Sequence, residues 1–354
     1  MATVGRTFRE KKMKRYLLAL LSAACICAAI PAGAQDAGSF FKGKQLRFVV
    51  GSAVGGGYDL FARIVARHMV HHIPGEPSII VQNLPAAGGI VMINQLYAQG
   101  PKDGTVIGVP INGMPTAPML MSGTQFDSSK LIWIGSTNRE AYVAYIWHTV
   151  PIHDIRELAE KELTVGATTP GTTMVDFPLL INDVLGYKFK IVRGYGGTSQ
   201  IDLAIERGEL QGNGALGWAS IKARQQHWLD DKSIRVLAQY GLQRYQELPD
   251  VPTMLELAKD EPARQAMKML FARTEYGRPY FLPPDVPADR VETLRRAFDA
   301  TMKDPAFVAE ASKLQLDVTP MTGEEVQNLV GELARTPAEI TKRVRAALDV
   351  PMAK

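Results

Sequence analysis

Cysteine is nearly absent from this chain of 354 residues, since only Cys25 and Cys27 occur. Both lie within residues 1–34, where a basic stretch precedes an apolar run and an Ala-Gly-Ala motif that ends at Ala34. That order predicts a secretory signal peptide cleaved after Ala34, with Met13 as an alternative start. The mature chain then contains no cysteine, which excludes disulfide bonds and a cysteine nucleophile. Export without cysteine points to a bacterial periplasm.

Long hydrophobic runs and excess charge are lacking as well. The apolar run of the signal peptide is shorter than the about 20 residues that span a bilayer, and no later run is longer.

The chain has 40 basic and 36 acidic residues. Residues 1–34 hold six of the basic residues and one of the acidic residues, so the mature chain carries 34 basic and 35 acidic residues. This balance gives no argument for a nucleic-acid partner. The mature 320 residues are enough for two lobes with separate cores.

Motifs of the common catalytic centres are missing too. The chain has no Gly-x-Ser-x-Gly, no His-Glu-x-x-His and no Walker motif. His68, His71 and His72 have helical spacing, but a metal site would also need an acidic or cysteine partner. Histidines near the C-terminal end of a helix are favoured by the helix dipole, and we prefer that interpretation. We therefore expect no catalytic residue, no metal and no cofactor.

Glycine, in contrast, is concentrated where strands end. An apolar strand over 46–50 runs through a glycine-rich turn over 51–59 into a helix from Leu60, and Asp59 supplies a carboxylate at the first turn of that helix. Such a turn lets a ligand approach backbone N–H groups at the positive end of a helix, which favours an anion. The dinucleotide pattern Gly-x-Gly-x-x-Gly lacks its third glycine here. Because Asp59 already supplies a carboxylate, a smaller anion that shares the site with it fits better than a phosphate.

Strand and helix signals alternate along the chain in a βαβ manner. A second small-residue turn, residues 83–89, follows a strand over 78–82 and leads into a helix from about Ile90 to Ala98. Parallel strands share a direction, so both turns are expected to open at the same edge of one sheet.

The pattern repeats in a second half, with turns at 168–173 and 193–198 that each lead into a helix. The chain then returns to the first half through residues 276–281. Helices follow from Pro287 and Pro305, with one long last helix from Thr322, and we expect them to pack on the first lobe. Two crossings between lobes predict a hinge.

Some turn residues have two interpretations that stay open. Thr172 or Thr173 can cap the following helix, or the threonine hydroxyls can donate to a ligand. Tyr58 and Tyr195 stand beside glycines, where they can bind a carboxylate or stack on a ring, or simply pack at the lobe boundary.

Several motifs together resemble the extracytoplasmic solute receptors of the tripartite tricarboxylate transporters, the Bug receptors. These motifs are GGGYD at 55–59, QNLPAAGG at 82–89, PKDG at 101–104, RGEL at 207–210 and, the most specific, RYQELPDVPT at 244–253. They cover essentially the whole mature chain in the family's order.

The resemblance implies an α/β protein with the type II periplasmic binding protein fold, in which two Rossmann-like lobes joined by a two-strand hinge close on an organic acid. We place the first lobe at 35–143 and 243–354 and the second at 144–242. The implied protein is a monomeric periplasmic receptor that performs no chemistry. It would hand its ligand to a large and a small integral membrane subunit of the transporter.

The resemblance also implies the binding residues. First-lobe turns would hold a ligand carboxylate, partly through ordered waters, and second-lobe turns would meet the rest of the ligand. The residues carried over are Gly57, Tyr58, Asp59, Ala87, Gly88 and Gly89 in the first lobe, and Thr168, Thr169, Thr172, Thr173, Gly194, Tyr195, Gly197 and Asn213 in the second. Tyr58 replaces the family's usual threonine or serine and changes the width of the pocket. Asn213 stands where the family often has aspartate.

The motifs leave two further classes of function open. One is a periplasmic sensor that signals its ligand to a membrane kinase. The other is a secreted enzyme on the same two-lobed scaffold, which the missing catalytic motifs disfavour. The acid itself can be aliphatic or aromatic, with one, two or three carboxylates.

Overall fold

The structure, a computed structural model, describes residues 40–55, 57–168, 171–314 and 316–348. The predicted signal peptide and its cleavage after Ala34 lie outside the described residues. Within them, no helix is both long and apolar enough to cross a membrane.

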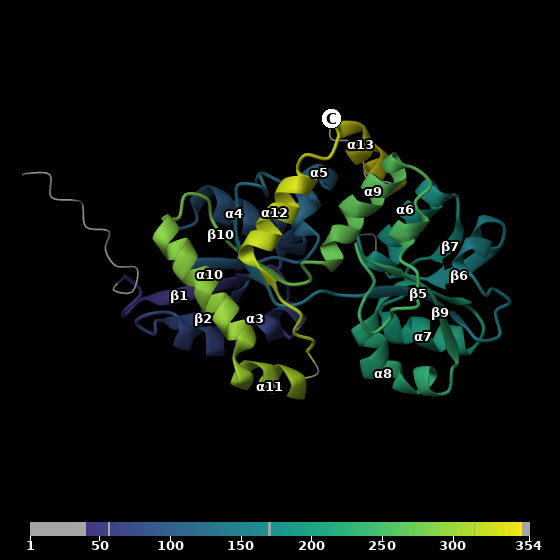
Figure 1. The fold of residues 1–354 in the computed structure, drawn as a ribbon, viewed down its shortest axis with the longest axis horizontal. Coiled ribbons are helices and arrows are strands. Elements are labelled where there is room, and N and C mark those ends of the chain that lie inside the picture. Colours follow the sequence, from purple (N-terminus) through teal and green to yellow (C-terminus); the bar gives the residue numbers. More distant parts are fainter. Residues whose placement is uncertain (1–39, 56, 169–170, 315, 349–354) are drawn as a thin grey trace, which may run out of the picture.

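Two separate β-sheets lie at opposite ends of the molecule (Figure 1). The first sheet has the strand order β11-β4-β10-β3-β1-β2. Its strands are β1 (Gln45–Val50), β2 (Ser78–Asn83), β3 (Val106–Val109), β4 (Ile132–Ser136), β10 (Pro279–Leu282) and β11 (Met321–Thr322). β1 pairs in parallel with β2 and β3, whereas β10 runs antiparallel to both β3 and β4. The carboxyl ends of β1 to β4 therefore share one edge with the start of β10.

The second sheet has the order β7-β6-β8-β5-β9. Its strands are β5 (Tyr142–Trp147), β6 (Glu162–Gly166), β7 (Lys188–Val192), β8 (Gly212–Gly217) and β9 (Ile234–Tyr240). β6 is parallel to β7 and β8, and β5 is antiparallel to β8 and β9. The start of β5 therefore lies at the same edge as the carboxyl ends of the other four strands.

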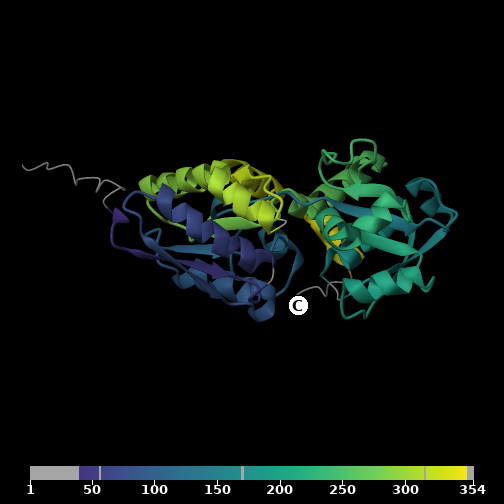
Figure 2. The same cartoon turned by 90° about the horizontal axis from the view of Figure 1, so that it is seen from below.

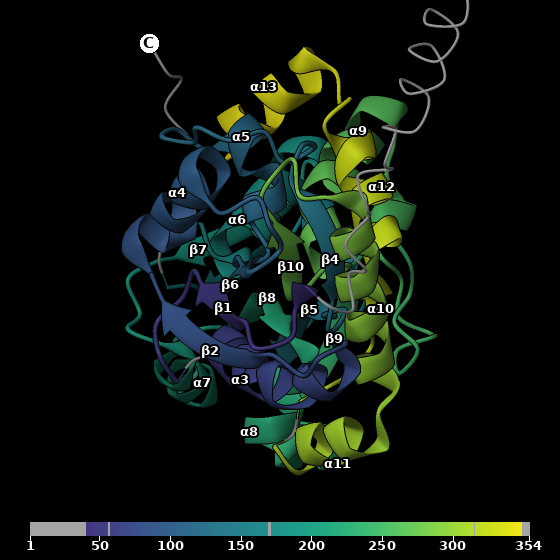
Figure 3. The same cartoon turned by 90° about the vertical axis from the view of Figure 1, so that its left-hand side faces the viewer.

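Helices cover both faces of the first sheet because its strands alternate apolar side chains between the faces. Phe48 and Val50 belong to the cluster under α3 (Gly57–Met69), α10 (Ala288–Lys303) and α11 (Pro305–Lys313). Val49 points to the opposite cluster, under α4 (Ile90–Gln99) and α12 (Gly323–Leu333). Figure 3 shows the two layers on either side of the strands.

The second sheet is covered in the same way. α6 (Thr173–Leu185) and α9 (Glu261–Phe271) lie on one face, and α7 (Thr198–Glu206) and α8 (Trp218–Asp230) on the other. Shorter elements are α5 (Ala117–Leu120), η2 (Val70–His72), η3 (Ala86–Gly89), η4 (Met114–Thr116), η5 (Ile155–Ala159), η6 (Met254–Leu257) and η7 (Ala272–Thr274).

The chain crosses between the sheets twice, after β4 and between β9 and β10 (Figure 2). The two crossings are hydrogen-bonded to each other, because Glu140 N–H donates to Thr274 O at 2.8 Å and Gly277 N–H to Asn138 O at 2.9 Å. The two-lobed α/β architecture with a two-strand hinge is therefore confirmed. The lobe boundaries given above stay predictions.

The expectation of one long last helix is wrong. Thr322 does begin a helix, through a reciprocal capping box with Glu325, but the helix ends before Pro337 and a separate α13 (Ala338–Ala347) follows. Proline lacks the backbone N–H and disfavours a helical residue before it, so the chain turns there. α10, α11 and α12 pack on the first lobe as expected, whereas α13 contacts α9, α6 and α5. One apolar cluster runs continuously through these helices from the first sheet to the second.

Candidate functional site

Asp59 fixes the turn between β1 and α3. Its carboxylate is buried and accepts hydrogen bonds from Gly55 N–H at 2.9 Å, Asn83 Nδ2 at 2.9 Å and Arg63 Nε at 3.0 Å. Burial alone would raise the pKa of Asp59, but the hydrogen bonds from Arg63, Gly55 and Asn83 hold the pKa below its usual value. Because Asn83 ends β2, the same carboxylate joins the first turn to the second. Both of its oxygens are engaged by protein donors.

The second first-lobe turn lies directly against the first. Ala87, Gly88 and Gly89 all have left-handed backbone conformations, with φ of 50°, 64° and 93°. A Cβ on Gly89 would stand 2.9 Å from the carbonyl oxygen of Gly51, so only glycine allows this approach. The structure thus brings the two predicted first-lobe turns together at the crevice edge.

The two second-lobe turns are also joined. Gly194 N–H donates to Thr168 O at 3.2 Å, and Tyr195 N–H donates to Ala167 O at 3.3 Å. Thr172 is the N-cap residue of α6 and Gly197 that of α7, so each turn ends at a helix N-terminus. Thr169 lies outside the described residues.

Two predicted second-lobe residues form hydrogen bonds with Ala215 of β8. Thr173 Oγ1 donates to Ala215 O at 3.3 Å. Asn213 is fully buried in β8, where its Oδ1 accepts from Ala215 N–H at 3.0 Å and its Nδ2 lies 3.6 Å from Met174 Sδ. In this arrangement Asn213 supports the strand beneath the crevice.

A pocket of about 210 Å³ lies between the lobes, where the sheet edges face each other. It takes residues from α3, both crossings, the start of α6 and the β8–α8 turn. Its lining includes Phe61, Glu140, Tyr142, Thr173, Trp218, Ser220, Tyr245 and Arg278. Thr173 is the one predicted site residue, among those that the structure describes, on this wall.

Sequence reasoning missed the charged pair of this pocket, Arg278 and Glu140. Their Nη1 and Oε1 atoms are 2.6 Å apart, and the two side chains are only 15% and 21% exposed. Tyr142 Oη donates to the same carboxylate. The sequence contains one signal for Arg278, which is its position directly before an apolar strand. Since the start of that strand lies at the crevice edge, an arginine there also lies at this edge.

Tyr58 packs beneath this pair. The Arg278 guanidinium lies 5.4 Å from the centre of the Tyr58 ring, and Asn112 N–H donates to Tyr58 Oη at 2.9 Å. Burial, together with the charge of Glu140, raises the pKa of Tyr58, so the phenol stays protonated. Its oxygen therefore holds the turn after β3 at the crevice.

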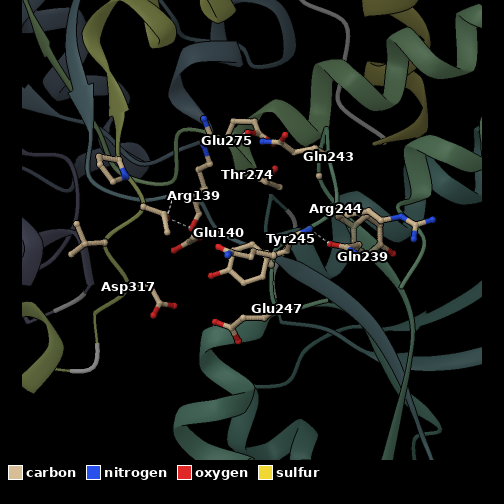
Figure 4. Close-up of a pocket in the computed structure, with 17 residues that line it drawn as sticks. Arg139, Glu140, Gln239, Gln243, Arg244, Tyr245, Glu247, Thr274, Glu275 and Asp317 are labelled. Carbon is tan, nitrogen blue, oxygen red and sulfur yellow. Dashed lines mark hydrogen bonds and ion pairs between the residues drawn. The ribbon is translucent and has the colours of Figure 1, made fainter. Parts of the chain in front are cut away.

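A larger cavity of about 560 Å³ (Figure 4) shares Arg139, Glu140 and Tyr245 with this pocket. Glu275 lies buried in its wall, where its carboxylate accepts from Leu242 N–H at 3.3 Å and stands 3.7 Å from Arg139 Nε. Burial raises the pKa of Glu275, and the positive charge of Arg139 offsets this only in part. The Glu275 carboxylate contacts both crossings, so its charge affects the stability of the hinge.

We expect Glu275→Gln to gain stability relative to the parent protein as the pH rises. A carboxyl whose pKa is raised by folding loses folding stability as the pH climbs from its unfolded value of 4.5 through the raised value. Glutamine does not titrate and is free of this loss. Urea unfolding between about pH 4 and pH 7 measures the difference. A difference that is constant over this range would contradict the expectation.

The histidines of α3 and η2 have structural partners. His68 Nε2 lies 2.8 Å from Glu310 and His72 Nε2 lies 3.0 Å from Asp304, so they connect this segment to α11. Among the described residues, no group of three or more histidine, cysteine or acidic side chains could hold a metal ion.

Two α/β lobes with their strand ends facing a shared crevice, joined by a two-strand hinge, have the architecture of a two-lobed periplasmic binding protein. The family described as tripartite tricarboxylate transporter family receptor matches residues 61–345. The chain therefore belongs to this family of periplasmic solute receptors.

Known proteins of this kind are similar over nearly their whole length. The UPF0065 protein in gbd 5'region of Cupriavidus necator is 22% identical over 348 residues, 96% of this chain and 98% of that protein. A TctC solute binding protein from Polaromonas, solved without ligand, has a TM-score of 0.70 at 19% identity, over 86% of this chain and 98% of that one. MatC from Rhodopseudomonas palustris with bound malate has a TM-score of 0.56 at 18% identity, over 86% and 99%. These structures share the fold.

Proposed function

We propose that this receptor captures a carboxylate-bearing organic acid between its lobes and delivers it to the two membrane subunits of a tripartite tricarboxylate-type transporter. The proposal includes export through the signal peptide at residues 1–34, action as a monomer in the periplasm, and the lobe boundaries at 143/144 and 242/243.

The arrangement of the crevice is the observation that supports this proposal. Joined backbone turns from each lobe lead into α3, α6 and α7, so the N-termini of three helices lie at the crevice edges. Backbone N–H groups there can replace the water that a carboxylate loses on binding, and the helix dipoles favour its charge. The malate bound in MatC is a carboxylate of the expected kind.

Predicted site residues keep their proposed roles at these edges. Gly57, Ala87, Gly88 and Gly89 would present backbone to one carboxylate. Thr168, Thr172, Gly194, Tyr195 and Gly197 would meet the distal part of the ligand. Asp59 and Asn213 would act indirectly, by holding the turn and the strand.

A thermal-shift screen of mono-, di- and tricarboxylates, with amino acids, sugars and amines as controls, tests the proposal. A ligand at 100 times its Kd is expected to raise the free energy of unfolding by about 2.7 kcal/mol. Quenching or enhancement of Trp fluorescence offers a second readout, because Trp218 lines the inter-lobe pocket. Stabilisation by no acid but by one of the control classes would overturn the proposed ligand, and turnover of a bound acid would overturn the receptor role.

A further inference from the structure

Asp317 lies where the first lobe faces α8 of the second lobe. It belongs to the segment between α11 and β11, and its neighbours Leu316 and Val318 pack against the apolar cluster under α3, α10 and α11. Thr319 N–H donates to Thr137 O at 3.2 Å, which ties this segment to the end of β4. The Asp317 carboxylate forms no hydrogen bond and no ion pair with any other described residue. A charge on a well-held segment is thus left without a partner.

A groove of about 470 Å³ lies between this carboxylate and α8. One wall is formed by α11 and the segment of Asp317, and the other by Ala219, Lys222 and Gln226 of α8. Figure 1 shows both helices at the lower edge of the view, one on each lobe. The groove shares Ala219, Leu316 and Asp317 with the inter-lobe pocket, so it belongs to the same crevice.

The first turn of α8 is complementary to a carboxylate. The first N–H groups of a helix have no partner within the helix, and they form its positive end. Gly217, the N-cap residue of α8, has no side chain that could accept from them. Ala219 and Ser220 in this turn are exposed and line the inter-lobe pocket. The α8 wall therefore offers donors that a carboxylate from the opposite lobe can cap.

Lys222 adds a positive charge to the same wall. Its Nζ lies 2.8 Å from both oxygens of Glu247. Glu247 and Asp317 point towards the same gap in Figure 4, and burial together with these two charges raises the pKa of Tyr245 to about 12. Lys222 thus cancels the repulsion that Glu247 alone would exert on Asp317. An ammonium group has three donors, so one remains for a second carboxylate.

From these contacts we infer that Asp317 is an inter-lobe latch: when the lobes close on a ligand, its carboxylate caps the N-terminus of α8 and pairs with Lys222. The inference rests on the proposed function, because closure on the ligand brings the two walls together. The latch raises ligand affinity without touching the ligand, since it stabilises the closed state that the ligand selects.

Calorimetry in low-salt buffer with malate, and with any other carboxylate that stabilises the parent protein, tests the latch. We expect about 5-fold weaker binding for Asp317→Asn and about 10-fold for Asp317→Lys, which sets a second positive charge against Lys222. In about 1 M NaCl the loss in Asp317→Asn should nearly vanish, because the Debye length falls to about 3 Å. Asp289→Asn is the matched control, since this exposed aspartate lies in the first turn of α10, beyond the end of β10 that points away from the crevice.

Urea unfolding of the ligand-free protein separates a latch from a structural role. Asp317→Asn should leave the unfolding midpoint unchanged, because the carboxylate has no partner until the lobes close. A lower midpoint with an unchanged salt dependence of binding would overturn the latch.

A crosslink measures the approach of the two walls directly, because Cys25 and Cys27, both within the predicted signal peptide, are the chain's only cysteines. Asp317→Cys combined with Ser220→Cys is expected to form a disulfide on mild oxidation, and faster with the acid bound. Capping brings the two Cα atoms within the about 7 Å that a disulfide spans. Asp289→Cys combined with Ser220→Cys should form none. No disulfide in the first pair, with or without acid, would overturn the latch.

The outcomes separate this inference from the proposed function. If the parent protein binds a carboxylate and Asp317→Asn binds it as tightly at low salt, the latch is absent while the receptor function stands. Tighter binding by Asp317→Asn would place the ligand's own carboxylate at α8 and also overturn the latch. If the parent protein binds none of the carboxylates, the proposed function fails, and the crosslink still decides whether the two walls meet.

Discussion

Arg273→Met is expected to destabilise the folded protein by about 3–5 kcal/mol, because it would leave a buried carboxylate without its cation. Arg273 Nη1 lies 3.2 Å from Asp176 Oδ2, and both side chains are less than 10% exposed. Asp176 stands in the first turn of α6, and its other oxygen accepts from Gly171 N–H at 3.1 Å. The pair thus connects η7, beside the hinge, to the turn before α6, which we propose contacts the ligand.

Urea unfolding followed by circular dichroism measures this loss, and two variants make it specific. Arg343→Met removes the cation that pairs with Asp183, which lies on α6 as Asp176 does. The Arg343 and Asp183 side chains are 35% and 39% exposed, so the expected loss of folding stability is at most about 1 kcal/mol. Arg273→Met combined with Asp176→Asn removes both charges and is expected to recover part of the stability. A loss of less than 1 kcal/mol for Arg273→Met alone would show that the carboxylate finds another partner.

Local sequence signals were enough for the turns and for most element starts. The glycines before Asp59, the left-handed Gly88 and Gly89, and the capping residues Thr322 and Glu325 each act on neighbours a few residues away. Such signals can be found in one sequence because the interacting groups share a short segment. The alternation of strands and helices then led to two parallel-type sheets and their shared edges.

The buried charged pairs at the crevice and beside the hinge could not be found in this way. Arg278 and Glu140 are 138 positions apart, and Arg273 and Asp176 are 97 apart. Each partner alone looks like an ordinary charged residue near a turn, and only the packing of the two crossings brings the pairs together. The split of the last helix had a local signal in Pro337, but the packing of α13 against α6 and α9 depends on tertiary contacts.

Asp59→Ala is expected to abolish detectable binding of the acid found in the screen and to cost about 2 kcal/mol of folding stability. The substitution removes the acceptor for Gly55 N–H and Asn83 Nδ2 and takes from Arg63 its carboxylate partner. The first turn would then no longer be held beside β2, so the backbone of Gly57 at the N-terminus of α3 would lose its position at the crevice edge. Calorimetry measures the binding, and Asp289→Ala, an exposed acid in the first turn of α10, is the matched control.

The pH dependence gives this prediction a second test. Folding lowers the pKa of Asp59 below 3.8, so its contribution to stability is complete above about pH 4 and is lost as the pH falls through the lowered value. The stability difference between the parent protein and Asp59→Ala should therefore be full at pH 6 and shrink towards pH 3. An equal difference at both pH values would mean that the carboxylate charge does not hold the turn. Unchanged acid affinity in Asp59→Ala would remove this residue from the site altogether, because every proposed contact of the first lobe depends on the turn that it fixes.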